Sequence, residues 1–166
     1  MRIHTLHREQ LLPLPPAAVF PFFADAANLE AITPPLLRFR VTTPQPLQIG
    51  PGALIDYRLR VHGVPIGWQS RIDEWSPPHR FVDLQVRGPY ARWHHTHTFR
   101  GTPEGGTLMT DTVRYAIGYG PLGELAHRLL VRRDLERIFD HRANAIIPLL
   151  ARDNERRTTP LDSARI

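Results

Sequence analysis

The chain contains neither cysteine nor lysine. Without cysteine it can form no disulfide, no thiolate metal site and no cysteine nucleophile. Every cationic side chain is therefore an arginine, and the formal net charge is +5. These arginines are spread along the sequence rather than clustered, and no nucleic-acid-binding motif accompanies them. We therefore expect no nucleic-acid partner.

Long apolar runs are also missing, so we expect no stable insertion into a membrane. The first residues, 1–5, lack the hydrophobic core of a signal peptide, which favours a cytoplasmic location. No serine lies in a nucleophile-elbow motif, and no segment supplies a clear oxyanion hole. These absences count against hydrolysis through a serine nucleophile.

The pattern of residues predicts an α+β domain. A strand over 2–12 is followed by two short helices over 17–23 and 25–32, and then by about six strands between 37 and 115. Strands that follow one another with short connections favour an antiparallel meander. A long helix begins near Leu122, shows a change of spacing near Leu130, and should bend or end at Pro148.

This helix is the only element long enough to cover one face of the sheet. A curved sheet around a single helix leaves a space between them, which is a natural ligand cavity. We expect residues 1–152 to form one domain and the polar residues 153–166 to form a flexible tail.

Two strands carry the most informative pattern, 93–99 and 109–115, with a turn over 102–106 between them. Both alternate with a period of two. If Gly101 pairs with Thr107, then Phe99 lies opposite Met109 and His97 opposite Asp111. Titratable groups then lie on the apolar face, where a charge must be paired or functional.

His95, His97 and Asp111 could form a metal site with two histidines and one carboxylate. The alternative is a hydrogen bond from His97 to Asp111 that orients polar groups in a cavity wall. We favour the hydrogen bond and expect neither a metal nor a cofactor. The same His97–Asp111 pair could also act catalytically as a general base.

Several segments resemble the START/Bet v 1-like superfamily (SRPBCC), and in particular its bacterial cyclase/dehydrase-like or cell-division-inhibitor-like branch. They are residues 13–23, 77–83, 88–90, 93–99 and 135–142, within a resemblance that covers roughly residues 1–150. It implies a helix-grip fold, in which a curved antiparallel sheet of about seven strands surrounds a long C-terminal helix. It does not fix an activity, because the superfamily includes lipid carriers, polyketide cyclases and hydroxylase subunits.

The orientation of Asp83 and Gln85 is ambiguous. Alternation alone buries Val82, Leu84 and Val86 and turns Asp83 and Gln85 toward solvent. The resemblance instead favours an inward Asp83 that joins His95 in a polar patch. Both orientations stay open.

We predict that the cavity binds a hydrophobic small molecule, such as a lipid, an isoprenoid or an aromatic polyketide-like compound, with its polar end near His95, His97 and Asp111. The residues expected to line it are Tyr57, Trp68, Asp83, Gln85, Trp93, His95, His97, Phe99, Met109, Asp111, Val113 and Tyr115.

Two other functions remain open: a cofactor-free cyclase or dehydratase that uses His97 and Asp111, and a non-enzymatic regulatory or interaction module. We favour ligand binding without catalysis over an enzymatic function. The sequence also allows a homodimer through a sheet edge without deciding it.

Overall fold

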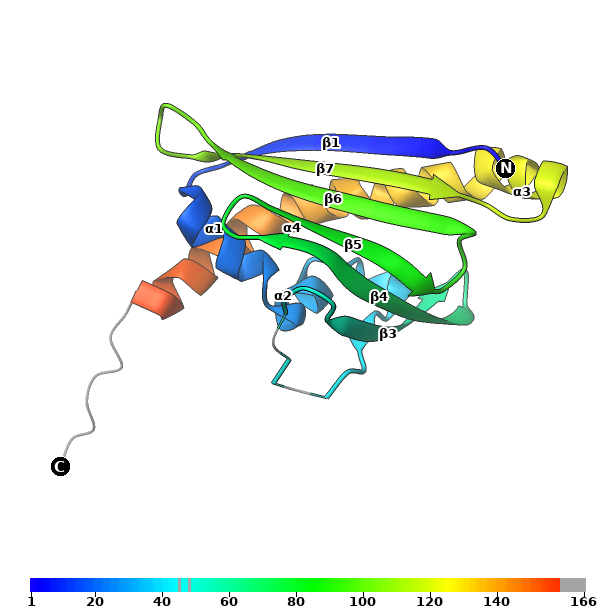
Figure 1. Ribbon diagram of the computed structural model, residues 1–166, viewed down its shortest axis with the longest axis horizontal. Helices are drawn as coiled ribbons and strands as arrows, with labels where there is room; N and C mark the ends of the chain where they lie inside the picture. Colours follow the sequence, from blue (N-terminus) through cyan, green and yellow to red (C-terminus); the bar gives the residue numbers. More distant parts are fainter. Residues whose placement is uncertain (45, 48, 159–166) are drawn as a thin grey trace.

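The computed structural model describes residues 1–44, 46–47 and 49–158. Seven strands form one antiparallel sheet in the order β1-β7-β6-β5-β4-β3-β2 (Figure 1). The strands are β1 (His4–Leu12), β2 (Arg40–Val41), β3 (Leu54–Val61), β4 (Val64–Ser76), β5 (Arg80–Arg87), β6 (Arg92–Gly101) and β7 (Thr107–Ala116). From β2 to β7 each strand pairs with the next in the chain, which confirms the predicted meander.

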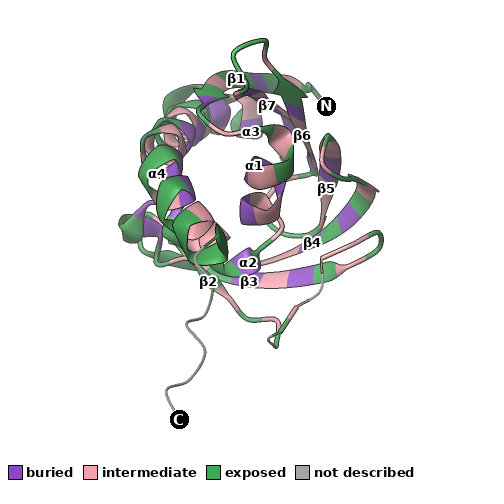
Figure 2. Cartoon of the chain, turned by 90° about the vertical axis from the view of Figure 1, so that its left-hand side faces the viewer, coloured by how far each residue is buried: buried purple, intermediate pink, exposed green. Residues whose placement is uncertain are grey.

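The helices lie on the concave side of the sheet. They are α1 (Pro16–Phe23), α2 (Ala26–Ala31), α3 (Gly120–Ala126) and α4 (Arg132–Thr158), with a π-helical turn at His127–Val131 between the last two. Seen end-on, the sheet curls from β1 to β3, and α4 covers the open side (Figure 2). This is the expected helix-grip architecture.

Local signals explain the two short helices. The fixed backbone angle of a proline suits the first helical turn, and α1 begins at Pro16. At α2 the Asp25 side chain accepts a hydrogen bond from the backbone N–H of Ala27 at 2.9 Å, which caps the helix.

The C-terminal helix is longer than expected. Of the two outcomes expected at Pro148, a bend or an end, the second does not occur, because the helix continues through Thr158 and residues 153–158 are helical. The buried Ile146 and Leu150 flank the proline and hold both sides of the helix against the core. Residues 159–166, the rest of the predicted tail, lie outside the described part of the chain.

The strand predicted over residues 37–41 is also mostly wrong. Pro35–Leu37 form a 3₁₀ turn, and Arg38 adopts a left-handed backbone conformation with φ 44°. Only Arg40 and Val41 pair with β3. The two prolines before this segment, Pro34 and Pro35, favour a turn over an extended start.

The described core has three apolar clusters, one of them formed by Ile55, Tyr57 and Ile72 of β3 and β4 and the other two packed along α4. Of these two, one contains Phe20, Phe22, Phe99 and Met109 and packs against Ile146 and Leu150. The other contains Trp93, Val113 and Tyr115 and packs against Leu135 and Phe139. The stretch of α4 between the clusters includes Arg142, and it is here that the sheet presents polar side chains.

None of the described helices combines the length and the apolar character that a bilayer crossing demands.

The neighbours Ile146 and Ile147 test how α4 is held. Ile146 is 1% exposed and Ile147 is 43% exposed. We expect Ile146→Ala to lower the free energy of unfolding by about 2–5 kcal/mol, because it leaves a cavity in the core. Ile147→Ala should change it by less than about 1 kcal/mol. Urea denaturation of both variants measures the difference, and equal losses would contradict this packing of the helix.

Candidate functional site

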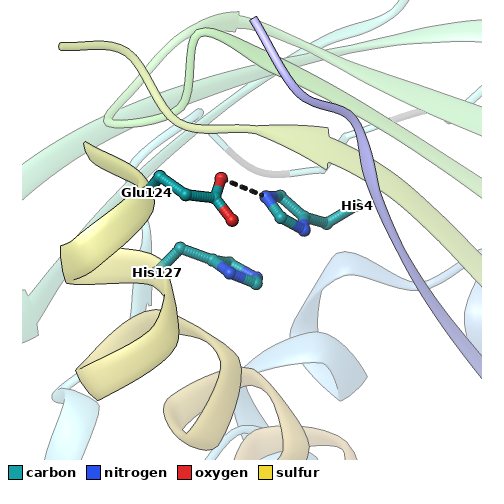
Figure 3. A group of neighbouring side chains, drawn as sticks. All are labelled: His4, Glu124 and His127. Atoms are coloured by element: carbon teal, nitrogen blue, oxygen red, sulfur yellow. Dashed lines mark hydrogen bonds and ion pairs between the residues drawn. The ribbon is translucent and has the colours of Figure 1, made fainter. Parts of the chain in front are cut away.

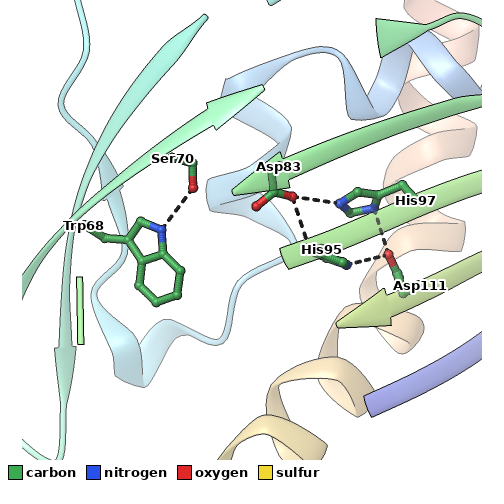
Figure 4. A network of polar contacts seen from close by, with 6 residues as sticks. All are labelled: Trp68, Ser70, Asp83, His95, His97 and Asp111. Atoms are coloured by element: carbon green, nitrogen blue, oxygen red, sulfur yellow. Dashed lines mark hydrogen bonds and ion pairs between the residues drawn. The ribbon is translucent and has the colours of Figure 1, made fainter. Parts of the chain in front are cut away.

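Four ionisable side chains from three neighbouring strands meet on the concave face of the sheet (Figure 4). Asp83 of β5 lies opposite His95 of β6, and His97 of β6 lies opposite Asp111 of β7. The register predicted for residues 93–99 and 109–115, with Gly101 opposite Thr107, is therefore confirmed.

The hydrogen bonds run diagonally rather than straight across. His95 Nε2 donates to Asp111 Oδ1 at 3.0 Å, and His97 Nε2 donates to Asp83 Oδ2 at 3.2 Å. Two further close approaches complete the ring of four. His97 Nδ1 lies 2.7 Å from Asp111 Oδ1 without the angle of a hydrogen bond, and His95 Nδ1 lies 3.4 Å from Asp83 Oδ2. The predicted His97–Asp111 hydrogen bond is thus replaced by two diagonal ones.

Aromatic side chains fix the two imidazole rings in place. The ring of Phe81 stacks on that of His97 with centroids 4.0 Å apart and planes 17° apart. Phe139 of α4 presents its ring to His95 at 5.5 Å in an edge-to-face arrangement. Both imidazoles are almost fully buried, and the ring centroids lie 3.7 Å from one another. Packing therefore limits how far either ring can turn.

Burial and neighbouring charges shift the pKa values of the two histidines in opposite directions. Burial lowers the pKa of His95, and the charge of His97 lowers it further. Burial also opposes the charged form of His97, but the Asp111 carboxylate outweighs this and raises the pKa of His97. The two pKa values therefore shift in opposite directions, and His97 is the more readily protonated of the two imidazoles.

Both carboxyl groups stay ionised although they are buried. Burial opposes ionisation of Asp111, but the charge of His97 and the hydrogen bond from His95 hold its pKa well below its usual value. For Asp83 the charge of His95 and the hydrogen bond from His97 likewise outweigh burial and lower the pKa. Each carboxylate is paired, as a charge inside a protein must be.

A cavity of about 210 Å³ opens beside this group, between the sheet, α2 and α4. Most of its wall is aromatic or aliphatic. Its polar lining includes Asp83, His95, His97, Tyr57, Ser70 and Arg142. Burial, assisted by the charge of Asp83, raises the pKa of Tyr57, so its hydroxyl stays protonated and can donate a hydrogen bond.

Six of the twelve residues predicted to line the cavity do so: Tyr57, Trp68, Asp83, Trp93, His95 and His97. The other six lie outside it. Phe99, Met109, Val113 and Tyr115 pack instead into the two core clusters along α4, because α1 and α4 press directly on β6 and β7 there. Asp111 and Met109 border a second space of about 40 Å³ between β1 and α4.

Gln85 holds a turn rather than lining the cavity. Its side-chain amide donates to the Tyr90 backbone oxygen at 2.7 Å and accepts from the Tyr90 N–H at 3.3 Å. Asp83 does face the cavity, as the resemblance suggested and the alternation did not. Val82 on the other face is also buried, at 2% exposure, so burial of Val82 and an inward Asp83 are compatible.

The contribution of α4 to the site was not predicted from the sequence. Leu135, Ile138, Phe139 and Arg142 all line the cavity. Their spacing of three or four residues places them on one helix face, and this signal was available in the sequence. The Arg142 guanidinium lies 5.2 Å from the centre of the Phe139 ring, and its buried Nε has no hydrogen-bond partner among the described residues.

The diagonal bonding makes Asp111 important for stability. Asp111→Asn removes the main charge partner of the buried His97, so we expect the free energy of unfolding at pH 7 to fall by about 3–5 kcal/mol. Asp140→Asn is the matched control, because that side chain is 65% exposed and, among the described residues, pairs only with Arg8. It should change stability by less than about 1 kcal/mol. Similar urea midpoints for the two variants would show that the buried network is not formed in solution.

Comparisons with known proteins agree with this fold. The chain aligns at 17% identity with the Zhui aromatase/cyclase from Streptomyces sp. R1128, over 98% of this chain and 100% of that one, with a TM-score of 0.65. It aligns at 15% identity with the protein CV1439 from Chromobacterium violaceum, over 88% and 96% of the two chains, with a TM-score of 0.67. For Ara h 8.0201 the identity is 18%, the coverage 87% and 98%, and the TM-score 0.60.

No curated protein sequence gives a significant match. A family model described as polyketide cyclase / dehydrase and lipid transport matches residues 4–146. Since this match spans most of the chain, the protein belongs to that family, within the START/Bet v 1-like superfamily.

Proposed function

We propose that this protein binds a hydrophobic small molecule with one polar end in the cavity between the sheet and α4. The observation that carries the proposal is a largely apolar space of about 210 Å³ with a compact polar group on one wall. Binding sites for small molecules have this composition, in which apolar walls supply affinity and a few polar groups fix orientation.

The size of the space narrows the class of ligand. An apolar cavity of about 150 Å³ holds benzene, so this space suits a body of about two fused rings or an alkyl chain of similar volume. Aromatic side chains line much of it, including Phe22, Phe39, Trp68, Trp93 and Phe139. Their faces and edges favour a flat, unsaturated ligand. We therefore infer an aromatic or polyene ligand with at least one oxygen.

The orientation of such a ligand follows from the placement of the polar groups. Asp83, His95 and His97 share the β5–β6 part of the wall, and Arg142 faces them from α4. Arg142 forms no ion pair within the described ranges, and its guanidinium lies 5.2 Å from the centre of the Phe139 ring. Its N–H groups are thus free to bind a ligand oxygen, while the apolar body lies toward Phe39 and Leu59.

A cavity-filling variant tests whether the space is the binding site. Leu59 of β3 lines the cavity, and Leu54 of the same strand is 46% exposed and does not. Leu59→Trp should abolish binding of 2-methylnaphthalene, because the indole occupies the space that the probe needs. Leu54→Trp should leave the affinity unchanged. Isothermal titration calorimetry measures both, and undiminished binding by Leu59→Trp would exclude this cavity as the site.

A second pair of variants tests the polar end. The probe 2-naphthol differs from 2-methylnaphthalene by a hydroxyl in place of a methyl group. We expect His97→Phe to weaken 2-naphthol binding at least about tenfold, the value of a hydrogen bond to a charged group, and to spare 2-methylnaphthalene. His94→Phe is the control, since His94 lies on the other face of β6. Equal affinity of wild type and His97→Phe for 2-naphthol would remove His97 from the proposal.

A further inference from the structure

The polar wall of the cavity has a feature that ligand binding alone does not require. One carboxylate oxygen, Asp111 Oδ1, lies 3.0 Å from His95 Nε2 and 2.7 Å from His97 Nδ1. The other nitrogen of each ring faces Asp83 Oδ2, at 3.4 Å for His95 Nδ1 and 3.2 Å for His97 Nε2. Asp111 thus lies on one side of the two rings and Asp83 on the other (Figure 4).

A neutral imidazole carries a single N–H. Without a metal ion, His97 Nε2 gives its N–H to Asp83. If that proton leaves and both rings give their N–H to Asp111, then two nitrogen lone pairs and a carboxylate oxygen meet on the side of Asp83. Three such acceptors cannot lie this close together in a buried site without positive charge among them. A proton added to His97 would place positive charge on that ring alone. A divalent cation would instead be bound by all three acceptor atoms, the two ring nitrogens and the Asp83 oxygen.

We propose that Asp83, His95 and His97 bind a divalent transition-metal ion, with Asp111 orienting both imidazoles from behind. Their ligand atoms all lie within 4.8 Å of one another. Ligands bonded to zinc at about 2.0–2.2 Å in tetrahedral geometry are about 3.4 Å apart, close to the separations here. A carboxylate that accepts the second N–H of metal-binding histidines is the usual outer partner of such sites.

The chemistry of the three ligands defines the ion. Two imidazoles with one carboxylate suit zinc or ferrous iron, whereas magnesium and calcium prefer sets made of oxygen alone. The sequence suggested Asp111 as the carboxylate ligand. The structure assigns that role to Asp83, because Asp83 lines the cavity together with His95 and His97 and Asp111 does not.

Three protein ligands leave at least one coordination position open. Asp83, His95 and His97 all line the cavity and Asp111 does not, so the open position faces the cavity. The oxygen of a bound molecule would complete the coordination there. This part of the inference rests on the proposed function, while metal binding itself does not.

A second cluster of possible metal ligands lies elsewhere in the structure, and its geometry does not suit a metal ion. His4, Glu124 and His127 also place possible ligand atoms within 4.8 Å of one another (Figure 3). Their imidazole rings, however, stack with centroids 3.5 Å apart and planes 17° apart, so their in-plane lone pairs do not converge on one point. Glu124 is also already engaged in ion pairs with Arg2 and Arg128, so its carboxylate is less available to a metal ion. We therefore assign no metal to this cluster, and it provides a matched control.

The test is titration of chelator-treated, full-length protein with Zn²⁺ by calorimetry and with Co²⁺ by visible absorption. We expect wild type to bind one equivalent of each and to show the absorption bands of coordinated cobalt. His95→Gln and Asp83→Asn should weaken Zn²⁺ binding more than about 100-fold, and Asp111→Asn about 10–100-fold. His127→Gln should bind as wild type does.

Circular dichroism establishes which variants are folded. If a variant does not fold, the titrations of wild type still test whether the protein binds a metal ion. Absence of Zn²⁺ and Co²⁺ binding by wild type would overturn the proposal. So would metal binding that survives in folded His95→Gln but is lost in His127→Gln.

Binding of 2-methylnaphthalene in the presence of chelator separates this inference from the proposed function. If the hydrocarbon binds and Zn²⁺ does not, only the metal site is wrong. If Zn²⁺ binds and the hydrocarbon does not, the cavity proposal fails and the metal site stands.

Discussion

The register of three adjacent strands is the constraint on which the site depends. Side chains on a strand alternate between faces, so a shift of one residue in β5, β6 or β7 would move its ionisable groups to the opposite face. With Asp83 opposite His95 and His97 opposite Asp111, two acids and two imidazoles share one buried patch. Each charge is then paired across or along the strands, and the patch can exist inside the molecule.

Diagonal pairing makes the four groups one unit. Each imidazole donates to the carboxylate that is not directly opposite, so the network ties three strands together rather than two separate pairs. Phe81 and Phe139 restrict the rings from two sides, one from the sheet and one from α4. The orientation of the nitrogens is therefore set by packing as well as by charge, and a preorganised set of polar atoms faces the cavity.

The cavity itself arises from how α4 meets the sheet. Aromatic and aliphatic side chains fill the space near Leu135 and Phe139 and again near Ile146 and Leu150. Between these contacts the helix presents Arg142, which lines the cavity together with the polar Asp83, His95 and His97. The same stretch of α4 thus leaves the interior incompletely packed and places a cation across the cavity from Asp83, where its charge helps to lower the pKa of that carboxyl.

The sequence by itself determined the parts of this protein that depend on local pattern. Alternation in residues 93–99 and 109–115, with one turn between them, was sufficient to predict the hairpin register and the inward His95, His97 and Asp111, because the period of a strand admits few solutions. The meander and the single covering helix followed from connection lengths and from the one long periodic segment.

Only the tertiary structure decided which atoms meet. Asp83 enters the site because β5 pairs with β6 in one particular register, and Phe99 and Met109 leave it because α1 packs over them. Pro148 remains inside a helix because the core holds the turns on either side of it. These outcomes depend on contacts between segments distant in the chain, which no pattern within one segment contains.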